Sequence, residues 1–265
     1  MSVSMLSIVK AELNKCLKRY DLITILGVVA IGFVYAIGMR GDSYTGVENQ
    51  NALFWVTAEM LTSTILFICP LVMAFLGAQM LASEIDNNSI QLLNLRVRNR
   101  KKLFWGKSIS LIIICTSIYV ISIVILFAVY FIIPNKDTIY VSGTFTGNNV
   151  AELIIVLFLL YLYSFFFIPQ IALCLGTKFK PMVTMVITFC ITLVCNNVAN
   201  YGLVRYLNPM QYVVKMGNDV VATTERCVVD LNTKMFCIVM QMLIVAMYCV
   251  VSGCYAARSF AKRDL

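Results

Sequence analysis

The sequence predicts an all-α, polytopic membrane protein with six transmembrane helices. Of its 265 residues 60% are hydrophobic and only 13% are charged, and the mean hydropathy is +0.86. Soluble domains are about half apolar and about a quarter charged. Several apolar runs also reach the roughly 20 residues that a helix needs to cross a bilayer core. We therefore expect residues 1–265 to form a single transmembrane domain.

The residue types exclude several classes of protein. The chain has no histidine, which removes HExxH zinc sites and His-based proton relays or catalytic triads. Nearly all of its ten cysteines lie within apolar runs, where they serve as small hydrophobic residues rather than disulfide partners. The net charge of +8 does not indicate a nucleic-acid partner, because no soluble domain collects the basic residues. We expect no metal or cofactor in this chain.

The first element, residues 4–20, is expected to be an amphipathic helix along the inner membrane interface. Its apolar residues recur at steps of three and four, and basic residues fill the positions between them. The apolar positions are Leu6, Val9, Leu13, Cys16, Leu17 and Tyr20. The alternative is a cleaved signal peptide, but no small-residue cleavage site follows the apolar run at the usual distance.

Six apolar runs then predict the spans. They cover residues 22–39, 52–82, 108–133, 151–175, 182–204 and 235–257. Pro70 predicts a bend in the second span, because proline lacks an N–H and its ring clashes with the preceding turn. The outer segment 205–234 is apolar enough in part for short helices that dip into the outer leaflet, but periodicity does not decide this.

The distribution of basic residues predicts the orientation. Segments assigned to the inside hold 15 of the 21 Lys and Arg residues, and outer segments hold the other six. Cytoplasmic loops of membrane proteins carry such an excess. We therefore expect a multi-pass protein of the cell membrane with both termini in the cytoplasm.

A basic, polar segment, residues 83–107, interrupts the apolar chain between the second and third spans. It carries six basic residues, and the two long apolar runs that flank it require it to lie at a membrane surface. The residues that form a recognisable order along it are Glu84, Ser89, Leu92, Leu93, Arg100, Leu103, Gly106 and Lys107.

This order resembles the inner loop of ABC transporter permeases of the type-2 exporter class. That family has a Glu, a Gly-Thr pair, a Leu pair, Pro-Val-Ser-Arg, and then Gly-Lys at the start of the third helix. Here Asn88 and Ser89 take the place of the Gly-Thr pair, and residues 97–100 (VRNR) lack the family's proline. The interfacial first helix, the six spans, the outer segment and the ending Phe260, Arg263, Asp264 are also similar.

The resemblance implies that segment 83–107 forms a short cytoplasmic coupling helix. In the family this helix docks in a cleft of a separate ATP-binding-cassette subunit, which holds ATP and Mg. The implied coupling residues are Glu84, Ile90, Leu93, Val97 and Arg100. A second permease copy, identical or not, is implied as a further partner. The alternative is that the basic residues only set the topology and bind anionic membrane lipid.

The chain itself is not expected to hydrolyse ATP. Gly106, Lys107 and Ser108 match the end of a phosphate-binding loop, but position 101 is Lys instead of the required glycine, and no soluble strand precedes it. Energy must come from another subunit or from an ion gradient. An ion-coupled carrier needs an acidic group within the membrane, and Glu59 is the one candidate. It lies about 10 Å inside if its helix starts at Ala52, and at the headgroups if the helix starts at Leu61.

The expected function is export of an amphipathic or hydrophobic substrate, such as a peptide toxin, bacteriocin, antibiotic or lipid. Candidates for a translocation path are Glu59, Tyr161, Asn196, Asn197 and Asn200, although aromatic and amide side chains also serve in helix packing or lipid contact. Two alternatives stay open. One is a non-transporting immunity protein that sequesters a peptide, and the other is an ion-coupled secondary carrier.

Overall fold

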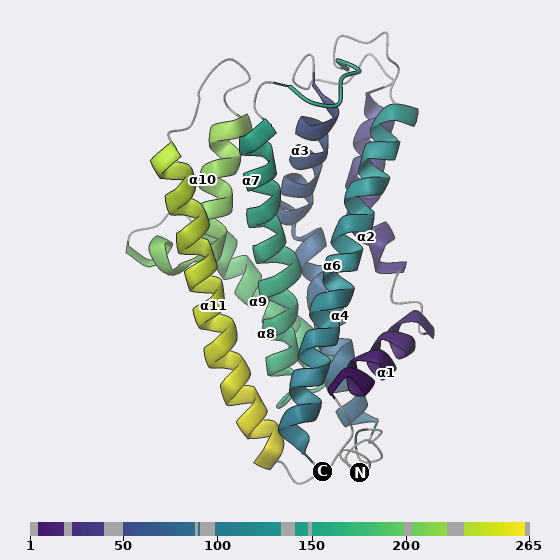
Figure 1. Cartoon of the computed structure of the whole chain (residues 1–265), viewed down its shortest axis with the longest axis vertical. Coiled ribbons are helices and arrows are strands. Elements are labelled where there is room, and N and C mark those ends of the chain that lie inside the picture. The colour runs from purple at the N-terminus through teal and green to yellow at the C-terminus, as the bar shows by residue number, and fades with distance from the viewer. Residues whose placement is uncertain are drawn as a thin grey trace.

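The helices run side by side along one long axis, and a shorter helix crosses the lower end of the bundle (Figure 1). This computed structural model describes residues 5–18, 23–39, 50–87, 90, 99–133, 141–147, 150–198, 203–221 and 231–262. The α-helices are α1 (Met5–Lys18), α2 (Thr24–Gly38), α3 (Ala52–Ile65), α4 (Ile68–Asp86), α6 (Arg100–Ile132), α7 (Val150–Leu160), α8 (Ile168–Leu175), α9 (Pro181–Val198), α10 (Pro209–Val221) and α11 (Leu231–Lys262). A π-helix, η2 (Tyr161–Phe167), joins α7 to α8, and a 3-10 helix, η3 (Leu203–Leu207), precedes α10.

Within the described parts of the chain, five helical segments are long and apolar enough to cross a bilayer, so the expectation of a helical, multi-pass membrane protein is confirmed. They are Ile68–Asp86, Arg100–Ile132, Val150–Leu175, Pro181–Val198 and Asn232–Lys262, and the shorter apolar helices are α2 and α3. The count of six spans stays a prediction. Two predicted boundaries differ clearly from the helices: α6 starts at Arg100 instead of 108, and α11 extends the predicted sixth span at both ends.

The predicted second span is interrupted between α3 and α4. Leu66 and Phe67 form a turn, and Phe67 has a φ of 62° in the left-handed region. Pro70 explains the position, because it has no N–H to donate to the carbonyl of residue 66 and its ring crowds that carbonyl. The helical pattern resumes where Leu71 N donates to Phe67 O at 3.0 Å. The expected bend is therefore a break one turn before the proline.

A second irregularity lies beside this break. The π-helix η2 ends where Pro169 enters the first turn of α8, and a π-turn commonly accommodates one extra residue within an α-helix. Ser164 of η2 shares a hydrogen bond of 3.2 Å with Thr64 at the end of α3. The two interruptions of helical hydrogen bonding are thus linked to each other.

Close backbone contact joins α4 to α8. A Cβ atom at Gly77 would lie 2.5 Å from the carbonyl oxygen of Pro169 and 2.7 Å from the Cβ of Ala172. Small residues allow helices to approach in this way in membranes, where packing replaces the hydrophobic effect as the driving force. This contact fixes α4 against α8, so that the end of α4 is a stable platform for the charged residues described next.

Candidate functional site

Helices α4 and α6 flank the segment that the sequence singles out for coupling. Glu84 lies in the last turn of α4, and Lys107 lies two turns into α6. Of the predicted coupling residues, Glu84, Ile90 and Arg100 are described, whereas Leu93 and Val97 lie outside the described residues.

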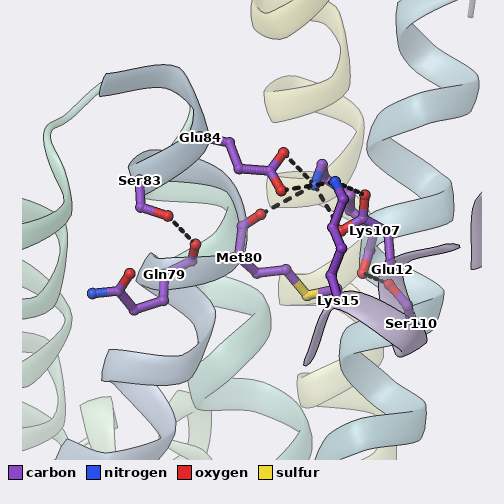
Figure 2. A network of polar contacts seen from close by, with 8 residues as sticks. All are labelled: Glu12, Lys15, Gln79, Met80, Ser83, Glu84, Lys107 and Ser110. Atoms are coloured by element: carbon purple, nitrogen blue, oxygen red, sulfur yellow. Dashed lines mark hydrogen bonds and ion pairs between the residues drawn. The ribbon is translucent and has the colours of Figure 1, made fainter. Parts of the chain in front are cut away.

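Glu84 and Lys107 meet two residues of α1 in a closed ring of four charges, Glu12, Lys15, Glu84 and Lys107, called the charge ring below (Figure 2). Lys107 Nζ lies 2.8 Å from Glu84 Oε2 and 3.0 Å from Glu12 Oε2. Lys15 Nζ lies 3.1 Å from Glu84 Oε1 and 3.1 Å from Glu12 Oε1. Each carboxylate therefore bridges both ammonium groups, and the formal charges of the ring cancel.

Lys107 is fully buried, and its ammonium group has all its hydrogen bonds. Its three donors meet the two carboxylates and the carbonyl oxygen of Met80, the last at 3.2 Å. A buried charge without partners is very costly, and a paired and fully hydrogen-bonded one is tolerated. Lys15 is more exposed. Partial burial lowers the pKa of its ammonium group, but the attraction of Glu12 and Glu84 outweighs this effect and raises the pKa above its ordinary value.

A glycine lets α1 approach α6 closely enough for this ring to form. A Cβ atom at Gly106 would lie 2.7 Å from Ile8 Cγ2. Ile8 and Glu12 are four residues apart and so lie on the same face of α1. Gly106 thus leaves room for Ile8, while Lys107, the next residue, donates a hydrogen bond to Glu12. The Gly-Lys pair of the sequence motif therefore has a packing role within this chain.

The charge ring contains two residues that the sequence did not suggest. Glu12 and Lys15 lie in the first helix, whose predicted inward face was purely apolar. In the structure Val9 and Cys16 are buried as that face requires, but Glu12 is also buried and Leu6 is 82% exposed. The sequence held one signal for a buried charge on this helix, because Glu12 is the one acidic residue among the basic residues of 4–20.

The other two described coupling residues have different surroundings. Ile90 is fully buried within the chain's own core, so its side chain offers no surface for a partner. Arg100 is partly buried at the first position of α6, which Asn99 caps by accepting a hydrogen bond from Lys102 N at 3.3 Å. Of the three described coupling residues, Arg100 is therefore the most exposed.

Glu59, the one acidic candidate within the spans, lies deep in α3. This helix starts at Ala52, where Asn51 Oδ1 accepts from Phe54 N at 2.8 Å, and Glu59 lies two turns after that start. The side chain is 6% exposed, and its Oε2 has no hydrogen-bond partner among the described residues. The indole Nε1 of Trp55, one turn away, likewise has none there.

The remaining path candidates do not all gather in one place. Tyr161 points to α6, where its hydroxyl shares a 2.8 Å hydrogen bond with Thr116 Oγ1. Asn196 of α9 accepts a hydrogen bond of 3.3 Å from Tyr163, two residues further along η2. Asn197 is exposed and donates to Leu193 O, and Asn200 lies outside the described residues. The hydrogen bond between η2 and α9 is therefore made by Tyr163, whereas the predicted path residue Tyr161 bonds to α6.

Among the residues that the structure describes, no group of three His, Cys, Asp or Glu side chains could hold a metal ion. The described residues do form ion pairs and hydrogen bonds. The most complete arrangement of these is the charge ring.

Comparison with known proteins gives one match. A family model described as "Protein of unknown function (DUF2705)" matches residues 15–265. The match includes Lys15, Glu84 and Lys107 of the charge ring, and Glu12 precedes it. No curated protein and no solved structure matches the chain.

Proposed function

The chain belongs to the DUF2705 family, and we propose that it is the membrane-spanning subunit of an ATP-driven exporter. A separate ATP-binding-cassette subunit docks on the segment between α4 and α6 and hydrolyses ATP. The cargo is an amphipathic or hydrophobic molecule, and two copies of the permease form the translocation path. Six spans are assigned, namely α2, α3 with α4, α6, α7 with α8, α9, and α11, and both termini are cytoplasmic.

The observation that carries this proposal is the charge ring. Glu84 and Lys107 stand on either side of the segment, at the end of one long helix and near the start of the next. Their contact with α1 joins three elements at one junction. A partner that pushes on the segment would therefore move α4, α6 and α1 together instead of only bending a loop.

The break between α3 and α4 would allow α4 to move relative to α3. Helix α4 is anchored to the junction at one end, and at the other it is separated from α3 by Leu66 and Phe67. Breaks in transmembrane helices are tolerated where neighbouring helices satisfy the freed polar groups. We assign the break as a hinge, across which displacement of α4 changes the contacts of η2 and α9.

Co-expression and co-purification with an ATP-binding-cassette subunit of the same cell test the proposal. We expect a complex whose ATP hydrolysis rises on reconstitution into membranes. Leu93→Glu and Arg100→Glu are expected to release the subunit, because each changes the proposed docking segment. Lys10→Glu is the matched control, since Lys10 is an exposed basic residue of α1 outside that segment. A complex that survives both segment variants would refute the proposal.

One observation favours a second candidate, an ion-coupled carrier. Glu59 is buried within a span with an oxygen that has no partner among the described residues, and such carboxyl groups are typical of ion-coupled transport. The carrier function predicts that Glu59→Gln abolishes uptake or efflux by proteoliposomes that contain this chain alone. Transport only in the presence of the ATPase and ATP, with Glu59→Gln active, would exclude it.

A further inference from the structure

A basic site lies at the same end of the bundle as the charge ring, where the chain leaves α8 and where α11 ends (Figure 1). A cleft of about 670 Å³ opens there between the turn after α8 and the last turns of α11. Its lining residues are Thr177, Lys178, Tyr255, Arg258, Ser259 and Lys262. Three of these six side chains are cations, and none is an acid.

The three cations have no carboxylate partner in the described part of the chain, where the ion pairs involve other lysines. Lys178 Nζ donates to the hydroxyl of Tyr255 at 2.6 Å and lies 4.6 Å from the centre of its ring. This contact joins the two walls of the cleft. Arg258 and Lys262 are four residues apart and so share one face of α11. Their charges therefore add at the mouth of the cleft.

The surroundings of the cleft match the boundary between headgroups and acyl chains. Along α11, on the side away from the helix end, the apolar residues Val250 and Val251 are 59% and 65% exposed. At the start of α9, Met182 is 71% exposed. A ligand with both an anionic group and long apolar chains would satisfy the cations and these apolar surfaces together. A soluble acidic protein would match only the cations.

We propose that this cleft is a binding site for the phosphate headgroup of an anionic phospholipid, with Arg258, Lys262 and Lys178 as the phosphate-binding residues. Arg binds phosphate through paired N–H groups, and Lys does so as a point charge. The hydroxyl of Ser259 is an additional donor. Basic pockets between transmembrane helices on the cytoplasmic side recognise lipid headgroups by this chemistry. The site is independent of the docking segment proposed above.

Native mass spectrometry of the purified full chain with added phosphatidylglycerol or phosphatidylcholine tests this proposal. The test variant is Arg258→Gln with Lys262→Gln. The control is Lys10→Gln with Lys18→Gln, which removes two exposed cations of α1 and so changes the net charge equally. We expect the chain to retain phosphatidylglycerol in preference to phosphatidylcholine. The test variant should weaken that retention about 30-fold, from roughly 1 kcal/mol per cation, and the control should not.

Three results would overturn the proposal. Equal loss of lipid in both double variants would show only general attraction between a basic protein and an anionic lipid. Displacement of the lipid by an equal concentration of inorganic phosphate would identify free phosphate as the ligand. Unchanged lipid retention in Arg258→Gln with Lys262→Gln, together with loss of the co-purified ATP-binding subunit, would identify the cleft as a protein-docking surface.

Discussion

At the scale of single residues, Lys107 shows how one buried charge can hold three helices together. Its ammonium group has no exposure to solvent and bonds to residues of α1 and α4. The sequence alone places Lys107 at a membrane interface, where a basic residue is expected to contact headgroups. The structure instead uses it as an internal partner of two carboxylates. The position of Lys107 in the sequence therefore did not reveal whether its side chain faces the headgroups or the interior of the protein.

Replacement of Lys107 by methionine is expected to destabilise the chain by about 3 kcal/mol, because Glu12 and Glu84 are left as two buried carboxylates that share only Lys15. Thermal unfolding in detergent measures the effect. Lys101→Met, at an exposed position in the first turn of the same helix, is the control and should change little. Adding Glu12→Gln and Glu84→Gln to Lys107→Met should recover part of the loss. An unchanged unfolding temperature in Lys107→Met would contradict the charge ring.

Gly106→Ala is expected to push α1 off α6. Its Cβ would lie 2.7 Å from Ile8 Cγ2, and overpacking of this kind costs about 1–3 kcal/mol. Faster proteolysis of α1 and a lower unfolding temperature would report the displacement. The double variant Gly106→Ala with Ile8→Ala removes the clash and should restore stability relative to Gly106→Ala. If it does not, Ile8 is not the residue that makes Gly106 necessary.

At the scale of elements, the sequence predicts the helices well and their irregularities less well. The six apolar runs correspond to α2, α3 with α4, α6, α7 with α8, α9 and α11, because length and hydropathy are properties of the segment itself. Pro70 signals an irregularity in its helix, but the break occurs a turn earlier, at the carbonyl that the proline leaves without a donor. The π-helix η2 has no periodic signature, since its residues YLYSFFF are aromatic on every side.

The start of α6 shows why charged residues mislead a hydropathy-based boundary. Residues 100–107 are basic enough to read as a loop, yet Asn99 caps the helix at Lys102 N, and Lys and Arg are good helix formers. The candidate site was likewise predictable from the sequence only in part. Glu84 and Lys107 belong to one segment of the sequence and could be predicted, whereas Glu12 lies 95 residues from its partner, and only the fold brings them together.

Pro70→Ala tests whether the break is the consequence of the proline. The added N–H can bond to the carbonyl of Leu66, so we expect slower amide exchange at Ile68 and Cys69 and a more continuous helix. Pro181→Ala is the control, because Pro181 is the first residue of α9, where proline removes no helical bond. If α4 moves about this break, transport should fall in Pro70→Ala and persist in Pro181→Ala. Unchanged exchange in Pro70→Ala would assign the break to other contacts.

At the scale of the whole molecule, both interfacial features lie at one end. The charge ring includes residues of α1, and the basic cleft includes the end of α11. Figure 1 shows α1 and the end of α11 in the lower part of the bundle, on opposite sides of the view. The inside excess of basic residues, 15 of 21 in the six-span assignment, agrees with that end being cytoplasmic. The proposed docking segment and the proposed lipid site thus lie on the same proposed membrane face.

Accessibility to a membrane-impermeant maleimide tests that orientation. Lys215 of α10 and Lys10 of α1 are both exposed and are assigned to opposite faces. We expect Lys215→Cys to react in intact cells and Lys10→Cys to react only after the membrane is permeabilised. Peptide mass spectrometry locates the label, so the native cysteines can stay. The reverse pattern would place α1 and the charge ring on the outer face, and an ATP-binding partner could not reach them.

The most direct test of the central claim is a cross-link between the segment joining α4 to α6 and the ATP-binding subunit. A photoreactive amino acid at position 93 is compared in cells with one at position 243, an exposed apolar site of α11. We expect an adduct with the mass of permease plus ATPase from position 93 and none from position 243. No adduct from position 93, or equal adducts from both positions, would contradict the claim.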